Sequence, residues 1–116
     1  MTSFQSKLKV GQAKNTAGGW IKFGRYGSGE LAMQIVTDSS VEAVATVSLV
    51  PYGAPHPGKF GVWLKGWSEN EGIPDALVKA GIVTLTGRTH PTGYVEAQHA
   101  ELTDAAREAL PATRRK

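Results

Sequence analysis

The sequence predicts an α+β domain: a curled, mainly antiparallel β-sheet of five to seven strands with two short helices, near residues 73–80 and 104–110. Apolar and polar residues alternate with a period of two through the first two-thirds of the chain. Two short segments with helix start and stop signals come later. The 116 residues, 41% of them hydrophobic, are enough for one core. We therefore expect one domain over residues 1–111 and a basic tail at 112–116.

The first four strands are expected to form an antiparallel meander. Alternation is clearest at 30–37, where Leu31, Met33 and Ile35 share one face and Glu30 lies on the other, solvent-facing side. Asp-Ser-Ser at 38–40 is typical of a turn, so this run and the next make a hairpin. The four expected strands cover residues 4–10, 19–26, 30–37 and 42–50.

A proline-rich segment separates this meander from the rest of the chain. Residues 51–58 hold three of the six prolines, which excludes helix and favours an extended loop. Alternation resumes at 59–67. Later, residues 82–88 and 93–102 are expected to pair as a hairpin around the turn Thr-His-Pro-Thr at 89–92.

The two helices are predicted from their end signals. Ser68 and Glu71 have the spacing of a capping box, while Pro74 is best placed in a first helical turn. We expect a capped turn at 68–72 and then a helix at 73–80, stopped by Gly81. For the second helix, at 104–110, Thr103 is the expected cap.

Charge is distributed unevenly along the chain, whose net charge is +3. Five cations and no acid precede Glu30, and the chain ends in Arg-Arg-Lys. This asymmetry is typical of a surface that meets phosphates or an acidic protein, and equally of a solvated basic arm. The five cations are Lys7, Lys9, Lys14, Lys22 and Arg25.

Several classes of chemistry are disfavoured. Without cysteine there is no disulfide, thiolate nucleophile or cysteine-built zinc site, and the three histidines lack ligand spacing. We expect no metal, no cofactor and no enzymatic activity. Glu69 and Glu71 could serve a small hydrolase or nucleotide-binding protein, or be a cap and a solvent-facing acid. With no apolar run of about 18 residues and no signal-peptide core, we expect no membrane association and a cytoplasmic, bacterial protein.

Alternation predicts a surface of aromatic and cationic side chains. It places Trp20 and Lys22 on the outward face of one strand, with Arg25 nearby, and a second group on another strand. Such a surface is typical of single-stranded nucleic-acid binding, and the same tryptophans could anchor a protein interface. Alternatively, they cover a second core face, with lysine stems passing beside them. The second group is Trp63, Lys65 and Trp67.

The motif Ser68-Glu69-Asn70-Glu71 with its surroundings resembles a family of small bacterial proteins carried by phages, plasmids and integrative elements. The resemblance covers residues 20–100 and includes the strings Trp67 to Gly72, Leu77-Val78, Ala80 to Ile82, Thr86 to Arg88 and Thr92 to Val95. The motif has no assigned chemistry in that family. The resemblance implies an accessory role in a mobile element, exerted by binding.

The leading hypothesis is therefore a non-enzymatic binding protein that docks on a protein or nucleoprotein partner. Its most concrete form is an inhibitor of a host-defence nucleoprotein complex. Direct binding of single-stranded nucleic acid through the tryptophans and lysines is the second hypothesis, and the small hydrolase or nucleotide-binding protein is the third.

Overall fold

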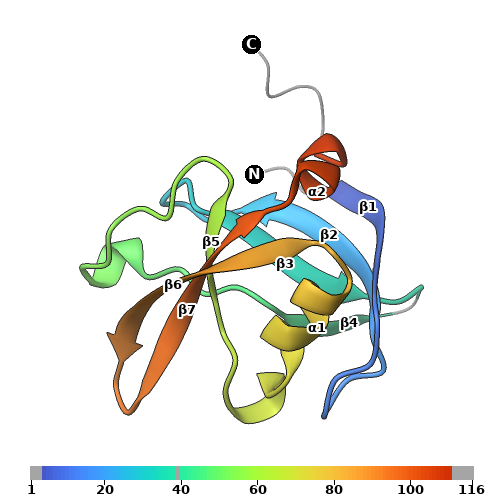
Figure 1. The fold of residues 1–116 in the computed structure, drawn as a ribbon, viewed down its shortest axis with the longest axis horizontal. Coiled ribbons are helices and arrows are strands. Elements are labelled where there is room, and N and C mark those ends of the chain that lie inside the picture. Colours follow the sequence, from blue (N-terminus) through green and yellow to red (C-terminus); the bar gives the residue numbers. More distant parts are fainter. Residues whose placement is uncertain (1–3, 39, 111–116) are drawn as a thin grey trace.

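Seven strands form two antiparallel sheets in the computed structural model, which describes residues 4–38 and 40–110 (Figure 1). With two short α-helices beside them, they confirm the α+β prediction. The strands form two sheets instead of the single curled sheet that was expected. The first sheet has the order β1-β2-β3-β4, from Phe4–Val10, Gly19–Arg25, Leu31–Val36 and Val41–Val44. The second has the order β5-β7-β6, from Gly61–Leu64, Val95–Leu102 and Val83–Thr92.

The first sheet is the expected meander. Ile21 pairs with Ile35 and Phe23 with Met33, and all four side chains are buried. β4 is shorter than the run 42–50 because the chain leaves the first sheet after Val44 and joins the second. Over residues 45–47, Ala45 N–H still donates to Met33 O at 2.9 Å, whereas Val47 N–H donates to Trp63 O at 2.9 Å. This crossing segment links the two sheets.

Helix α1, Ile73–Lys79, starts at the residue predicted from the sequence and ends one residue earlier than expected. Its N-cap is Gly72, with a left-handed φ of 88°, and no side chain caps it. Residues 68–70 form the separate turn expected before the helix, as the 3-10 turn η2 (Ser68–Asn70). No side chain caps this turn either, so the capping box of Ser68 and Glu71 is wrong. Pro74 lies in the first turn, where its missing N–H costs no hydrogen bond.

Helix α2, Asp104–Glu108, confirms its predicted cap. The Thr103 hydroxyl accepts a hydrogen bond from Ala106 N–H at 3.2 Å, as a threonine at this position can. The helix ends two residues before the expected position. The basic tail expected at 112–116 lies outside the described residues.

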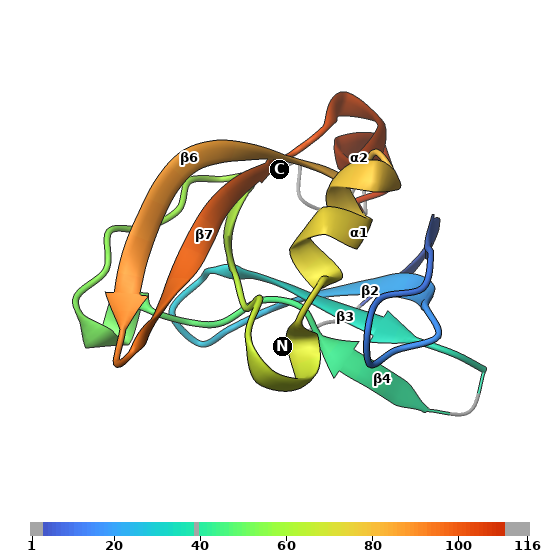
Figure 2. The same cartoon turned by 60° about the horizontal axis from the view of Figure 1, so that its bottom comes forward.

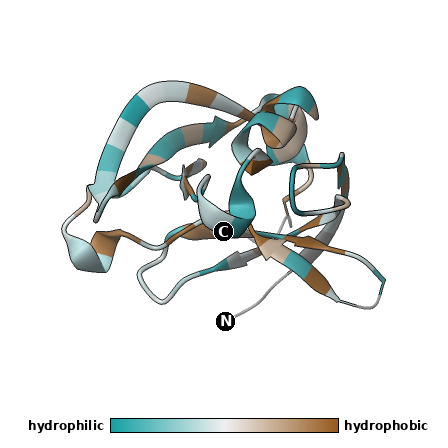
Figure 3. Ribbon diagram, turned by 90° about the horizontal axis from the view of Figure 1, so that it is seen from below, coloured by the Kyte–Doolittle hydropathy of each residue, from teal (hydrophilic) through white to brown (hydrophobic). Residues whose placement is uncertain are grey.

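The β6–β7 hairpin turns later than predicted. β6 continues through the Thr-His-Pro-Thr segment, and the two-residue turn is Gly93-Tyr94, with Gly93 at φ 75°. Its register against β7 shifts between Leu85 and Thr89, around Gly87 at φ 89°. The resulting arm arches away from the core, and Figure 3 colours most of β6 as hydrophilic.

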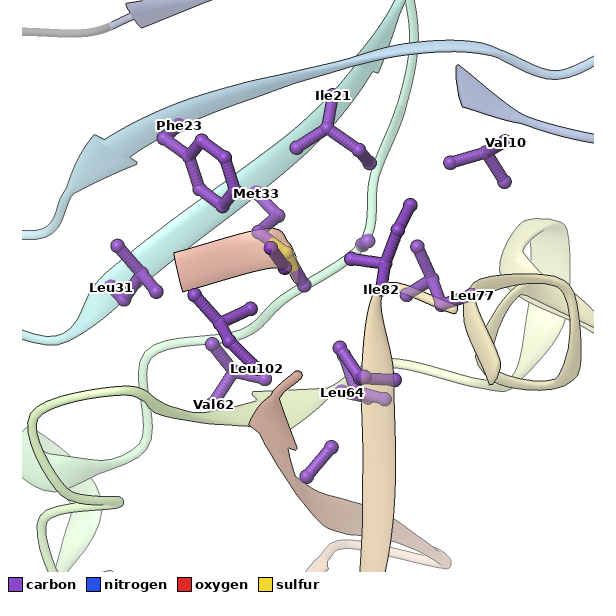
Figure 4. Packing of buried hydrophobic residues seen from close by; sticks show 14 of the residues in the cluster. Val10, Ile21, Phe23, Leu31, Met33, Val62, Leu64, Leu77, Ile82 and Leu102 are labelled. Atoms are coloured by element: carbon purple, nitrogen blue, oxygen red, sulfur yellow. The ribbon is translucent and has the colours of Figure 1, made fainter. Parts of the chain in front are cut away.

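One main core fills the space between the sheets. Figure 4 shows side chains of β2 and β3 meeting those of β5, α1 and the segment around Ile82. A smaller cluster lies beyond it, under the proline-rich loop, and consists of Leu49, Ala54, Trp63 and Ala97. The loop includes a 3-10 turn, η1 (Val50–Tyr52). Among the described residues, no helix has the length and apolarity needed to cross a membrane.

Candidate binding face on the four-stranded sheet

The first sheet has one face without a covering element in the described part of the chain. Figure 2 shows α1, α2 and the β6–β7 arm all on the other side of β2, β3 and β4. Register and alternation place the exposed-side residues in three cross-strand rows. The rows are Trp20–Val36–Val41, Lys22–Gln34–Val44 and Gly24–Ala32. We call these eight residues, with Lys9, the outer face.

Aliphatic surface is exposed at one side of this face. Val36, between Trp20 and Val41 in the first row, is only 5% exposed although it lies on the solvent side of the sheet. Val41 and Val44, on the edge strand β4, are 52% and 40% exposed. Together they leave branched apolar side chains in water next to a half-buried tryptophan.

Cations dominate the charge of the same sheet. Its four strands carry Lys7, Lys9, Lys22 and Arg25, and a single carboxylate, Glu42. The ammonium of Lys9 lies 5.6 Å from the centre of the Trp20 ring, within range for a cation–π interaction. Lys9 and Trp20 are also register partners on β1 and β2. Of these cations, Lys9 and Lys22 belong to the outer face, which is thus both apolar and positively charged.

A hollow of about 200 Å³ lies beside the second and third rows. Small-molecule sites usually occupy about 300–1,000 Å³, so this volume suits a single side chain better than a metabolite. Its walls are mainly apolar. The residues that line it are Lys22, Phe23, Gly24, Arg25, Tyr26, Ala32, Gln34 and Val44.

The sequence-based placement of Trp63 on an outward face is wrong. Trp63 is 2% exposed, its Nε1–H donates to Pro55 O at 3.1 Å, and its ring meets His99 edge-on at 5.2 Å. All of β5 is buried because the main core covers one face and the proline-rich loop covers the other. The alternative interpretation, a second core face, is what the structure shows for this residue.

Lys65 and Trp67 do not join the predicted surface either. Lys65 Nζ lies 2.6 Å from Glu69 Oε2, and Trp67 packs half-buried on the small cluster. Both follow β5, in the segment that leads to η2. The structure therefore brings Trp20, Lys22 and Arg25 together on the first sheet and separates the other three candidates from them.

The Ser-Glu-Asn-Glu motif forms a corner between β5 and α1. Asn70, 1% exposed, donates from Nδ2 to Val44 O at 2.7 Å and to Lys65 O at 3.1 Å. Ser68 has a left-handed φ of 58°, rare for a residue other than glycine. The motif thus fixes the corner to the end of β4.

Glu69 and Glu71 are both exposed, and each pairs with a different lysine. Lys65 lowers the pKa of the exposed Glu69 carboxyl to about 2, with help from backbone and Ser68 hydrogen bonds. Glu71 Oε1 lies 3.1 Å from Lys14 Nζ, at a contact 57 residues apart in sequence. The two carboxylates therefore do not share a buried cleft.

A buried carboxylate that the sequence interpretation missed lies just before β3. Glu30 was expected on the solvent side, but it is 1% exposed. Its oxygens accept hydrogen bonds from the Ser28 and Ser48 hydroxyls, both at 2.6 Å, and from the backbone N–H groups of Leu49 and Val50. Burial alone would raise the pKa of Glu30, but these bonds outweigh it and the pKa is lowered.

Tyr26, which lines the hollow, is held by a separate set of hydrogen bonds. Tyr26 donates from its hydroxyl to Thr46 O at 3.1 Å, and the Thr46 hydroxyl accepts from Met33 N–H at 3.1 Å. Burial and the nearby Glu30 carboxylate raise the pKa of Tyr26, despite its hydrogen bond with Thr46. Tyr26 is thereby fixed directly after β2.

Within the described residues, no three histidine, aspartate or glutamate side chains gather as metal ligands. No family model, curated protein or solved structure matches the chain.

Proposed function

We propose that this protein is a non-enzymatic binding protein that docks an acidic protein surface on the outer face of its four-stranded sheet. The observation that carries the proposal is the combination of exposed Val41 and Val44 with Lys9 and Lys22 on one uncovered face. Protein interfaces typically combine an apolar centre with a polar rim, and tryptophan and arginine are frequent anchors. Charge complementarity with carboxylates would orient the partner.

The geometry favours a protein over single-stranded nucleic acid. A strand-binding surface needs successive aromatic rings on which bases stack. Here Trp63 is buried and Trp67 precedes η2 and packs half-buried on the small cluster, so Trp20 alone remains on the outer face. The exposed valines, in turn, would interact little with phosphates, whereas their burial against an apolar protein surface would be favourable.

The resemblance to mobile-element proteins gives the proposal its most concrete form. An accessory protein of a phage, plasmid or integrative element could act by docking on a host complex, such as a defence nucleoprotein. In that form, the outer face would contact a protein subunit of the complex.

Affinity capture tests the proposal. The immobilised protein, its Lys22→Glu variant and an Arg88→Glu control are exposed to bacterial lysate with and without nuclease, and bound proteins are identified by mass spectrometry. Arg88 lies exposed on β6, in the other sheet. We expect a partner that survives nuclease treatment, is retained by Arg88→Glu and is lost by Lys22→Glu.

Purified partner then gives the dissociation constant for each variant. Loss of a buried or rim charge contact usually costs a few-fold to several hundredfold in affinity. A partner retained equally by all three proteins, or one released by nuclease, would contradict the proposal.

A further inference from the structure

We infer that the hollow beside Gly24 and Ala32 is a socket for one aromatic side chain of the partner, flanked in the partner by carboxylates. This inference rests on the proposed function and names the contact at its centre. The volume of the hollow, about 200 Å³, is below the usual range of about 300–1,000 Å³ for small-molecule sites and suits one large side chain.

The composition of the walls suits an aromatic ring. Gly24 and Ala32 are register partners, so the sheet presents almost no side chain there and leaves a flat, apolar floor. Glycine within a strand loses cross-strand packing, and it often marks a place where another group approaches the backbone closely. A flat ring covers such a floor better than a branched aliphatic chain does, as aromatic residues do when they cover strand glycines.

The positive charge at the rim of the hollow suits an aromatic ring flanked by carboxylates. Lys22 and Arg25 both line the hollow. The Arg25 guanidinium donates to Gly29 O at 3.0 Å, which holds its stem at the end of β2. A cation beside an aromatic ring is attracted to the ring face, and Lys9 already lies over Trp20 in this way on the same face. The same two cations would attract carboxylates on either side of the ring.

Peptide titration followed by NMR tests the socket directly. Three acetylated pentapeptides are used: tryptophan flanked by two acidic residues on each side, alanine in the same acidic frame, and tryptophan between lysines. We expect the acidic tryptophan peptide to shift the amide signals of residues 22–26 and 32–34, and to bind about tenfold more tightly than the alanine peptide. The lysine peptide should not bind.

Variants locate the site on the protein. Ala32→Leu should fill the hollow and abolish the difference between the tryptophan and alanine peptides, whereas Thr84→Leu on the exposed side of β6 should preserve it. Thermal unfolding shows that each variant is folded. If Ala32→Leu does not fold, Lys22→Gln replaces it, and we then expect weaker binding of both acidic peptides.

The outcomes separate this inference from the proposed function. If Ala32→Leu still captures the lysate partner and binds both acidic peptides as the parent does, while Lys22→Glu loses the partner, the face is correct and the socket is wrong. If neither variant changes capture, both are wrong. Signals that shift at residues 22–26 and 32–34 with adenosine monophosphate but not with the peptides would make the occupant a nucleobase and overturn the inference.

Discussion

Asn70 donates a hydrogen bond from its side-chain amide to the main-chain oxygen of Val44, 26 residues earlier, at 2.7 Å. The same nitrogen also donates to Lys65 O at 3.1 Å. These two bonds join the corner before α1 to the end of β4 and to the residue that follows β5. Val44 in turn lines the hollow and belongs to the outer face. The motif therefore helps to hold the candidate site in place, through the backbone of Val44.

Replacing Asn70 with alanine should destabilise the protein substantially. The change leaves two carbonyl groups without their donor in a buried place, which costs about 1–3 kcal/mol. Urea unfolding followed by circular dichroism measures the loss. Asn15→Ala, at an exposed position, is the matched control and should change the free energy of unfolding little. Equal stability of the two variants would mean that Asn70 does not hold the corner.

Substitutions at Ser68 should depend on backbone conformation rather than on the hydroxyl. The residue has φ 58° and caps neither η2 nor α1. Ser68→Gly should therefore be neutral or stabilising, whereas Ser68→Val should be less stable than Ser68→Gly by about 1–2 kcal/mol, because a β-branched side chain is disfavoured there. Thermal unfolding of the pair measures the gap. A loss of stability in Ser68→Gly equal to that in Ser68→Val would restore the capping role.

The Glu30 carboxylate should make stability depend on acid pH. Its pKa in the folded state is lower than in the unfolded chain, so folding favours the ionised form. This contribution is complete above the unfolded-state pKa and is lost as pH falls through the folded-state pKa. Glu30→Gln should cost about 1–3 kcal/mol at pH 7, since its amide group faces four donors. The difference from the parent should shrink progressively below about pH 4, near the usual glutamate pKa.

Urea unfolding of parent and Glu30→Gln between pH 3 and 7 checks this expectation. Glu42→Gln, at an exposed position on β4, is the control. A cost of Glu30→Gln that is the same at every pH would show that the carboxylate charge contributes nothing.

Alternation predicted those strands of which one face meets the core and the other meets solvent. It therefore identified β2 and β3 well. It failed at β5, because both faces of that strand are buried and the apolar pattern no longer indicates which side chains point to solvent. It also extended β4 too far, because residues 45–47 remain extended while changing sheets. That crossing depends on contacts with Trp63 and Lys65, distant in sequence.

The candidate site was predictable only in its parts. Trp20 and Lys22 could be placed on one outward face from their spacing alone. The hollow could not, because it depends on the register that brings Ala32 beside Gly24. Alternation assigned Glu30 to the solvent side, on the face opposite Leu31, Met33 and Ile35. Its donors at Ser48, Leu49 and Val50 come from a segment that only the fold brings near.

Gly61→Ala should loosen the proline-rich loop. A Cβ at this position would lie 1.9 Å from Pro57 O, a main-chain atom that cannot move without shifting the loop. We expect a loss of about 1–3 kcal/mol, typical of overpacking, and faster acrylamide quenching of tryptophan fluorescence as Trp63 becomes accessible. Gly27→Ala is the control, since a Cβ there meets nothing within 4 Å. Unchanged quenching and stability would mean that the loop does not depend on close contact at Gly61.

Single-stranded nucleic acid should bind weakly at most. The cations of β1 and β2 support nonspecific attraction, but Trp20 alone is available for stacking on the outer face. Each neutralised phosphate releases counterions, so affinity falls with salt with a slope of about 0.7 per contact. Fluorescence titration with a mixed-sequence oligonucleotide should therefore show binding at low salt that disappears near physiological ionic strength. Trp20→Ala and Trp67→Ala should both leave that residual binding unchanged, because charge alone produces it. Tight binding that survives physiological salt and is lost in Trp20→Ala, with the fold intact, would make nucleic acid the partner in place of an acidic protein.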